Sequence, residues 1–261
     1  MNKTTRNILI KVSFLTFLTA FIILVTAAKL RREKGTVEDI HFTLDAIEGN
    51  YFFTKEYILD YLKEKYPVSG KQMLAEDLRN VEDEIRNIPQ VKTAEAFFDN
   101  KNELNIHITQ RKPIARIFTT SGQTFYMDEE GYKIPVSLQY TAKVPLISGF
   151  VTERFTGRDS IHSALLKKVF SMLSIIHRDD FVNAELGQYD VQANGDIIAI
   201  PKLANFEVIL STENIEEQTK KLKVFYREGL THIGWDSIQS INLKYGHQVV
   251  VKKMINNNTN I

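Results

Sequence analysis

Apolar and polar residues follow several distinct patterns along this chain, and the first is a continuous apolar run. Residues 12–28 (VSFLTFLTAFIILVTAA) contain no charged residue, proline or glycine, and only Lys11 separates them from the apolar residues 8–10. About 20 apolar residues in a helix, each adding about 1.5 Å, cross a hydrocarbon core of about 30 Å. The run therefore predicts one transmembrane helix at residues 12–28, preceded by a short tail at residues 1–11.

A cleaved signal peptide and a buried core helix are the alternative interpretations of this run. The apolar region of a signal peptide has about 7–15 residues, which is shorter than this run, although Thr26-Ala27-Ala28 resembles a weak cleavage site. A core helix would need other elements around it. An uncleaved anchor is therefore the expected outcome. Basic residues flank the run almost equally on both sides, so charge counting does not decide its orientation.

The next pattern, at residues 37–111, predicts a small domain with the element order β-α-α-β-β. An extended segment at residues 37–44 precedes two helices, and the Thr54 side chain is suited to cap the first of them. Pro89 ends the second helix, because proline has no N–H and disfavours a helical predecessor. Two strands with alternating apolar residues follow, at residues 94–98 and 104–109. The second helix carries apolar residues at spacings typical of one buried face: Leu74, Leu78, Val81, Ile85 and Ile88.

Residues 112–253 predict a longer mixed β domain, and the whole chain is therefore expected to be α+β. Paired strands are expected at residues 114–119 and 123–128, and Asn194-Gly195 favours a tight hairpin turn. We expect helices at residues 158–177 and 212–229, the latter ending at Gly229. Residues 238–251 predict a long final strand or a strand pair. The polar tail at residues 254–261 is expected to be flexible.

Composition and motifs argue against catalysis. The net charge of +1 gives no field that would indicate nucleic-acid binding. The absence of cysteine excludes thiol catalysis, disulfides and cysteine-based zinc sites. The six histidines show no metal-ligand spacing, and the acidic clusters at residues 82–84 and 216–217 are typical of solvated helix faces. No nucleophile motif or phosphate-binding glycine loop is present. We therefore expect neither an enzyme nor a metal or cofactor site.

Several short blocks carry a resemblance to a known family. Residues 88–94 (IPQVKTA) and 103–115 (ELNIHITQRKPIA) combine a Pro-x-Val-x-x-Ala pattern, an alternating strand and an Arg-x-Pro-x-Ala junction. Later blocks are FYMDEEG at 125–131, VPLISG at 144–149, LKVFYREG at 222–229 and INLKYGHQVVV at 241–251. In this order and spacing they resemble the FtsQ/DivIB family of bacterial cell-division proteins, and most closely its Bacteroidetes branch.

The resemblance implies a fold, a location and a role. It implies a short cytoplasmic tail, one inner-membrane span, a periplasmic POTRA domain at residues 37–111 and a C-terminal β domain at residues 112–253. The family acts at the division septum as a non-catalytic scaffold of the divisome. It links earlier ring components to the FtsB/FtsL pair, and so to septal peptidoglycan synthesis. The POTRA domain is implied to contact other division components.

The resemblance also implies a partner-binding surface on the last strands, where a strand of FtsB adds to the sheet edge. By the matching block, this surface comprises Lys244, Tyr245, Gln248, Val249, Val250 and Val251. The alternative interpretation is that Tyr245 and Val249–Val251 only fill the core of the sheet. Gly246 interrupts the strand pattern and marks a bulge or a turn.

Two other functions stay open at this point. One is an outer-membrane assembly or secretion component that uses a POTRA domain. Such proteins carry several POTRA domains and then a barrel whose strands are each about 10 residues long, a pattern that this chain does not show. The other is a cell-wall enzyme on a membrane stalk, which would need a catalytic group that the motifs do not provide.

Overall fold

The computed structural model describes residues 13–26, 35–36, 39–68, 72–99, 101 and 103–254. The chain divides into two compact units. The first contains the chain up to Ala46 together with Phe53–Thr109, and the second contains Ile47–Phe52 together with the chain from Gln110 onward. The predicted tail at residues 1–11 and residues 255–261 of the predicted flexible tail lie outside the described residues, so both stay predictions.

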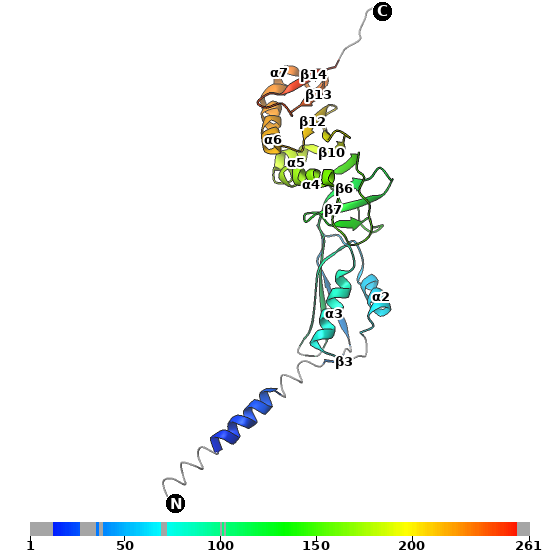
Figure 1. The fold of residues 1–261 in the computed structure, drawn as a ribbon, viewed down its shortest axis with the longest axis vertical. Helices are drawn as coiled ribbons and strands as arrows, with labels where there is room; N and C mark the ends of the chain where they lie inside the picture. Colours follow the sequence, from blue (N-terminus) through cyan, green and yellow to red (C-terminus); the bar gives the residue numbers. More distant parts are fainter. Residues whose placement is uncertain are drawn as a thin grey trace, which may run out of the picture. The chain divides into compact units, whose positions relative to one another are not determined.

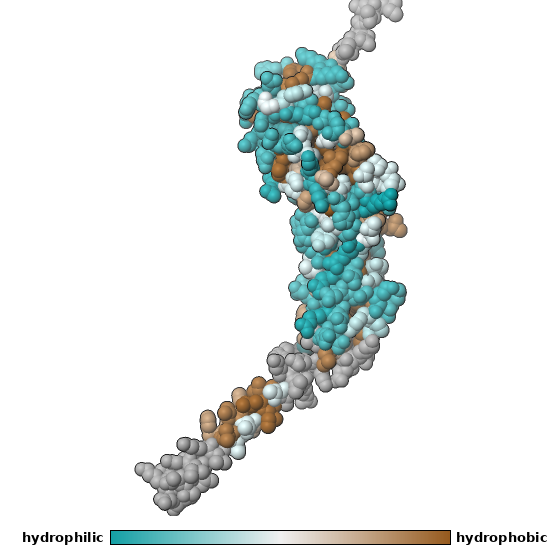
Figure 2. All heavy atoms as spheres, viewed as in Figure 1, coloured by the Kyte–Doolittle hydropathy of each residue, from teal (hydrophilic) through white to brown (hydrophobic). Residues whose placement is uncertain are grey.

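The described part of the N-terminal apolar run is a helix at residues 13–26 with exposed side chains. Large apolar side chains such as Phe14, Phe17 and Leu24 are exposed on it, and Figure 2 shows its surface as hydrophobic. Within the described residues, no helix has both the length and the apolar character required to cross a membrane. Residues 12, 27 and 28 of the predicted span lie outside the described part, so the transmembrane helix stays a prediction.

The first unit is a three-stranded sheet with two helices. The strand order is β2-β5-β4, and β2 runs parallel to β5. The order β2-α2-α3-β4-β5 along the chain is the β-α-α-β-β order that the periodicity indicates. A short pairing of β1 with β3 adds to it. The elements are β1 (Gly35–Thr36), β2 (Ile40–Leu44), α2 (Lys55–Lys65), β3 (Gln72–Met73), α3 (Ala75–Arg86), β4 (Val91–Phe98) and β5 (Leu104–Gln110).

Local hydrogen bonds explain where the helices of the first unit begin. The Thr54 side chain accepts a hydrogen bond from Tyr57 N at 3.3 Å, so Thr54 caps α2 as the sequence predicts. At the start of α3, the Asp77 carboxylate accepts a hydrogen bond from Leu74 N at 2.7 Å. Both helices bury an apolar face, which includes Ile58, Leu62, Val81 and Ile85.

The second unit is built on a nine-stranded mixed sheet (Figure 1). Its strand order is β14-β13-β12-β11-β10-β9-β6-β7-β8. Three neighbouring pairs, β6–β9, β9–β10 and β12–β13, are parallel, and the other pairs are antiparallel. The strands are β6 (Pro113–Phe118), β7 (Thr124–Asp128), β8 (Lys133–Pro135), β9 (Leu146–Gly149), β10 (Leu186–Val191), β11 (Asp196–Pro201), β12 (Glu207–Ser211), β13 (Ile238–Asn242) and β14 (Val250–Lys253).

Helical crossovers connect two of the parallel pairs. Parallel neighbours need a connection of about a dozen residues or more, and the chain supplies one between β9 and β10 and another between β12 and β13. The first contains α4 (Ala164–Ile176) and α5 (Asp180–Glu185). The second contains α6 (Ile215–Val224), the π-helical turn η1 (Phe225–Gly229), α7 (Leu230–Ile233) and the 3-10 turn η2 (Trp235–Ser237).

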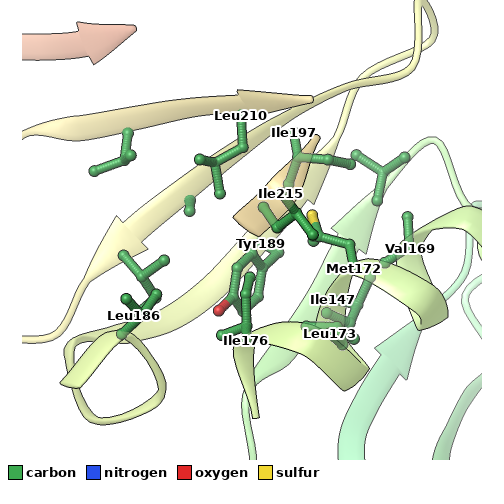
Figure 3. Close-up of a cluster of buried hydrophobic side chains, with 14 of the residues drawn as sticks. Ile147, Val169, Met172, Leu173, Ile176, Leu186, Tyr189, Ile197, Leu210 and Ile215 are labelled. Carbon is green, nitrogen blue, oxygen red and sulfur yellow. The ribbon is translucent and has the colours of Figure 1, made fainter. Parts of the chain in front are cut away.

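The hydrophobic core of the second unit lies between these helices and the sheet. In Figure 3, side chains from one face of α4 point toward apolar side chains of the strands, and Ile215 of α6 joins them. The α4 residues have the spacing of a single helix face: Val169, Met172, Leu173 and Ile176. Their strand partners include Ile147, Tyr189, Ile197 and Leu210, all buried.

The segment Ile47–Phe52 belongs to the second unit, although it lies between β2 and α2 in the sequence. Phe52 N donates a hydrogen bond to the Gln110 side chain at 2.7 Å, and Phe52 O accepts one from Ser137 Oγ at 2.8 Å. The Phe52 ring also lies 5.8 Å from the Tyr126 ring. The sequence pattern placed this segment inside residues 37–111, because nothing in its composition signals these long-range contacts.

Two helix limits differ from the sequence prediction. The helix expected at residues 158–177 begins only at Ala164. Tyr132 pairs with Ser160 in an isolated bridge, and Ile161 N donates to Gly131 O, so this stretch is held in an extended conformation. Ile161 is buried by that contact, and its helical spacing from Leu165 is coincidental.

The helix expected at residues 212–229 is also displaced, because it begins at Ile215 and continues through Gly229 to Ile233. Gly229 has helical dihedral angles, and a Cβ there would lie 2.6 Å from the Phe225 ring. Gly229 is therefore needed for close packing. Gly234, with φ +80°, takes the left-handed role that the prediction gave to Gly229.

Buried ion pairs hold the β6–β8 end of the sheet. Arg111 Nη1 lies 2.6 Å from Asp128 Oδ2, and both side chains are almost fully buried. Lys133 Nζ lies 3.0 Å from Glu153 Oε1 and 2.9 Å from Asp159 Oδ2. Burial alone would raise the pKa of Glu153. The N–H groups of residues 162 and 163, together with the Lys133 ammonium, lower it below its usual value instead.

We expect Lys133→Met to destabilise the second unit by about 3–5 kcal/mol, because it leaves two partly or fully buried carboxylates without their cation. Urea unfolding followed by circular dichroism measures this change. Arg227→Ala is the control, because Arg227 pairs with Glu228 at the surface with 72% of its side chain exposed, and it should leave the free energy of unfolding nearly unchanged. Equal effects of the two substitutions would contradict the assignment of Lys133 as a structural cation.

We expect Tyr189→Phe to stabilise the second unit by about 1 kcal/mol, because a buried unpaired hydroxyl carries a desolvation penalty. Within the described chain, the Tyr189 hydroxyl is buried and has no hydrogen-bond partner. Tyr126→Phe is the matched control, since the Tyr126 hydroxyl accepts a hydrogen bond from Ala142 N at 3.2 Å. That control should lose stability in the same unfolding experiment. A loss at both positions would show that the Tyr189 hydroxyl is satisfied.

Candidate functional site

The candidate site is the last strand of the second unit, β14. It stands at one end of the nine-strand order, and β13 is its neighbour in the described sheet. The two strands are antiparallel and pair Asn242 with Val250, Ile241 with Val251 and Ser240 with Lys252. Of the two alternatives for residues 238–251, a long strand or a strand pair, the structure shows the strand pair, with β14 continuing to Lys253.

The register shows which main-chain groups of β14 point away from β13. Leu243 N donates to Ile209 O of β12, so alternate residues of β13 face β12 and those between them face β14. Ser240 and Asn242 therefore exchange hydrogen bonds with Lys252 and Val250. The N–H and C=O groups of Val251 and Lys253 then point to the opposite side. We call this side the β14 edge; it presents the donors and acceptors that another strand needs.

Side-chain exposure separates the predicted site residues into two groups. Val249 and Val251 are half-buried and pack against the core of the second unit. Val250 is 46% exposed and Tyr245 is 54% exposed, and Gln248 is also exposed. The interpretation that these residues only fill the core thus fits Val249 and Val251 but not Tyr245 or Val250. Contact of the predicted site residues with a partner stays a prediction.

The connection between β13 and β14 contains the other predicted residue, Lys244. Its Nζ lies 2.7 Å from Asp196 Oδ2, at the start of β11, so the cation is paired within the unit. Gly246 and His247 form a turn, and Gln248 N donates to Tyr245 O at 3.3 Å. Of the two alternatives for Gly246, the structure thus shows a turn. Tyr245, with an exposed side chain, lies directly before this turn.

Two residues of α6 hold this connection, and sequence reasoning missed both. Lys221 Nζ donates to Leu243 O and to Tyr245 O at 2.5 and 2.7 Å. Glu217 Oε1 accepts a hydrogen bond from His247 N at 3.1 Å. That hydrogen bond is the main cause of a lowered pKa at the Glu217 carboxyl. The spacing of four residues between Glu217 and Lys221 indicates that both lie on one face of the helix. The same spacing is equally typical of an ordinary surface ion pair, so it does not identify contacts to the connection.

Two hollows flank the connection on α6. One has a volume of about 460 Å³, and its apolar wall includes Val224, Phe225 and Val249. The other, of about 380 Å³, is more polar and is lined in part by Lys244 and Tyr245. In the part of the chain that the structure describes, no cluster of His, Asp and Glu side chains is arranged to hold a metal ion.

The first unit also has an end strand. β2 stands at the end of the order β2-β5-β4. Asp45 N donates to Ile108 O, and Asp39 O accepts from Leu104 N, so the odd-numbered residues of β2 face β5. The main-chain groups of Ile40, Phe42 and Leu44 point away from β5. A hollow of about 320 Å³ lined by Ile40 and residues of α2 lies beside this strand.

These features define the class of the protein: a two-unit α+β protein in which each unit has an end strand, β2 or β14, with main-chain groups directed away from its sheet. Residues 112–252 match the family model "FtsQ/DivIB, C-terminal related". This match covers more than half of the chain, and the chain belongs to the FtsQ/DivIB family. The resemblance of the sequence blocks to that family is thereby confirmed.

Two curated relatives show the same relationship. The cell division protein FtsQ of Geotalea daltonii is 26% identical over 189 residues, which are 71% of this chain and 66% of the relative. The cell division protein FtsQ of Salinibacter ruber is 26% identical over 176 residues, which are 66% of this chain and 68% of the relative. The similarity thus spans just under two thirds of the length of the Geotalea protein.

A pair of proline substitutions tests the direction of the β14 main chain. Lys252→Pro removes an N–H that pairs with β13, whereas Lys253→Pro removes one that points away from it. Both side chains are exposed lysines, so the loss of charge is matched. We expect Lys252→Pro to cost at least about 1 kcal/mol more in unfolding free energy, the value of one main-chain hydrogen bond. A larger loss for Lys253→Pro in thermal or urea unfolding would reverse the assignment.

Proposed function

We propose that this protein is a non-catalytic, membrane-anchored scaffold of the bacterial divisome, and that it captures an FtsB/FtsL-type partner by strand addition at the β14 edge. Membership of the FtsQ/DivIB family supports the role in cell division. The binding mode is supported by one observation: β14 is an end strand, and the main-chain groups of Val251 and Lys253 point away from β13.

Strand addition uses the main chain for affinity and the side chains for selection. An added strand would continue the ladder that β13 and β14 begin. Val250 would offer it an exposed apolar contact beside the main-chain pairing, and Tyr245 an aromatic one at the preceding turn. Lys252 and Lys253 are exposed on β14. Their charges disfavour pairing of β14 with a second copy of itself and favour an acidic partner segment.

The membrane anchor is part of the same proposal. The helix at residues 13–26 exposes its apolar side chains, and exposed apolar surface on this scale is typical of contact with lipid. Its threonines fold back onto the helix: Thr16 Oγ1 donates to Ser13 O at 2.9 Å and Thr26 Oγ1 donates to Ile22 O at 2.8 Å. Such bonds satisfy hydroxyls where no water is available. We place the N-terminus in the cytoplasm and the two units in the periplasm, at the septum of the inner membrane.

The first unit is proposed to be the POTRA domain of the scaffold. Its element order and its exposed end strand β2 support contacts with other division components. In this arrangement the two units bind different partners, and the protein connects them without chemistry of its own. No nucleic acid is required as a partner.

Substitutions at the β14 edge test the binding mode. With the soluble segment of the FtsB-type protein from the same organism as probe, we expect Tyr245→Ala to weaken binding by about 2 kcal/mol, a typical value for an aromatic anchor. Val251→Pro should abolish capture, because it removes an outward N–H and places a pyrrolidine ring on the edge. Isothermal titration calorimetry measures both effects.

Val251→Ala is the matched control, because it shortens the same side chain and keeps the N–H. It should retain most of the affinity. Binding of Val251→Pro at the wild-type level would refute strand addition at this edge. Depletion of the protein in cells gives an independent readout, in which growth as filaments is expected and normal septation would contradict the role in division.

A further inference from the structure

A charged pair on α6 lies at the connection that leads into β14. The connection, residues 244–249, has no helix or strand of its own. It begins after the last residue of β13 that pairs with β14, and it determines where β14 enters the sheet. Movement of this connection would also move β14, because in the described sheet β14 pairs with a strand on one side only.

Lys221 fixes the first half of this connection. Its ammonium donates to two carbonyl oxygens, those of Leu243 and Tyr245. The Lys221 side chain is 12% exposed, and Glu217 Oε1 lies 3.7 Å from its Nζ. A lysine withdrawn from water to this extent needs compensation for the lost hydration. The two carbonyls and the neighbouring carboxylate provide it, so the contact is specific in geometry.

Glu217 fixes the second half. Its carboxylate accepts the hydrogen bond of His247 N, at a residue with φ +56°. Non-glycine residues adopt this left-handed conformation at an energetic cost, and the hydrogen bond to Glu217 helps to offset it. The His247 ring is almost fully exposed, with its Nδ1 3.9 Å from Glu217 Oε1, so the 3.1 Å main-chain hydrogen bond is the closer contact between the two residues.

We propose that Glu217 and Lys221, here called the α6 clamp, are positioning residues that pre-organise β14 for its partner. The inference rests on the proposed strand addition. An edge that is already in place loses less conformational entropy on binding than one that must be ordered at that moment. The clamp thus acts on a partner that it does not touch, by setting the register and order of the strand that the partner meets.

The helix that carries the clamp is packed against the core beside β14. The helix runs from Ile215 through η1 to Ile233, and Gly229 lets the Phe225 ring lie against it. Phe225 is buried and lines the hollow that Val249 also lines. The packed helix therefore gives the clamp a rigid base beside the start of β14.

Lys221→Met tests the clamp, because methionine keeps most of the length of lysine and donates no hydrogen bond. Lys220→Met is the matched control, since Lys220 is the exposed neighbour on the same helix. Two quantities are measured on the full chain in detergent: the amide exchange rates of residues 247–253, and the Kd for the soluble segment of the FtsB-type protein. We expect Lys221→Met to speed exchange across these residues and to raise the Kd about tenfold or more.

Lys221→Arg keeps a cationic donor and should restore most of the affinity and protection. The midpoint of global unfolding shows whether the unit itself stays folded in each variant. A raised Kd together with an unchanged unfolding midpoint in Lys221→Met supports the role of Lys221 as a positioning residue. Unchanged exchange and unchanged Kd in Lys221→Met would overturn the proposal. Absence of binding by the wild-type chain would instead refute the proposed function, and the exchange rates would still decide whether the clamp orders β14.

Discussion

The proposed binding mode depends on one constraint: a strand at the end of a sheet presents main-chain N–H and C=O groups that pair with no neighbouring strand, and β14 is such a strand in the described sheet. Its pairing with β13 satisfies Val250 and Lys252 and leaves the main chain of Val251 and Lys253 directed outward. A short strand with two lysines is a common way to keep such an edge from pairing at random. In the proposed function, the same edge pairs with a partner segment that matches its register and charge.

The rest of the second unit supports this edge. Two helical crossovers let parallel strands lie side by side and cover the core, and the buried pairs of Arg111 and Lys133 secure the opposite end of the sheet. The final crossover, which contains α6, also carries the two charged residues that hold the connection into β14. The crossover that helps cover the core therefore also contacts the segment that leads into the edge strand. The proposed strand addition needs a well-placed edge, because main-chain hydrogen bonds tolerate little error in distance or direction.

Elements with strong local signals could be predicted from the sequence. The Thr54 cap, the β-α-α-β-β order and the Asn194-Gly195 hairpin all depend on interactions within a few residues. The start of α4 could not be predicted, because Ile161 follows the helical spacing while a tertiary bridge holds it extended. The role of Gly229 depends on the Phe225 ring one helical turn earlier, and the sequence does not reveal that this ring lies against the helix in the core. In the candidate site, the matching block located the strand, but the exposure of Tyr245, the pairing of Lys244 with Asp196 and the contacts of Lys221 arise only from the fold.

Amide hydrogen exchange of β14 tests the central claim most directly. In the free protein, the amides of Val251 and Lys253 should exchange faster than those of Val250 and Lys252, because their N–H groups point away from β13. On addition of the soluble segment of the FtsB-type protein, Val251 and Lys253 should become protected while the other two change little. Protection of Val251 and Lys253 already in the free chain, or binding that leaves both exchanging freely, would contradict the account.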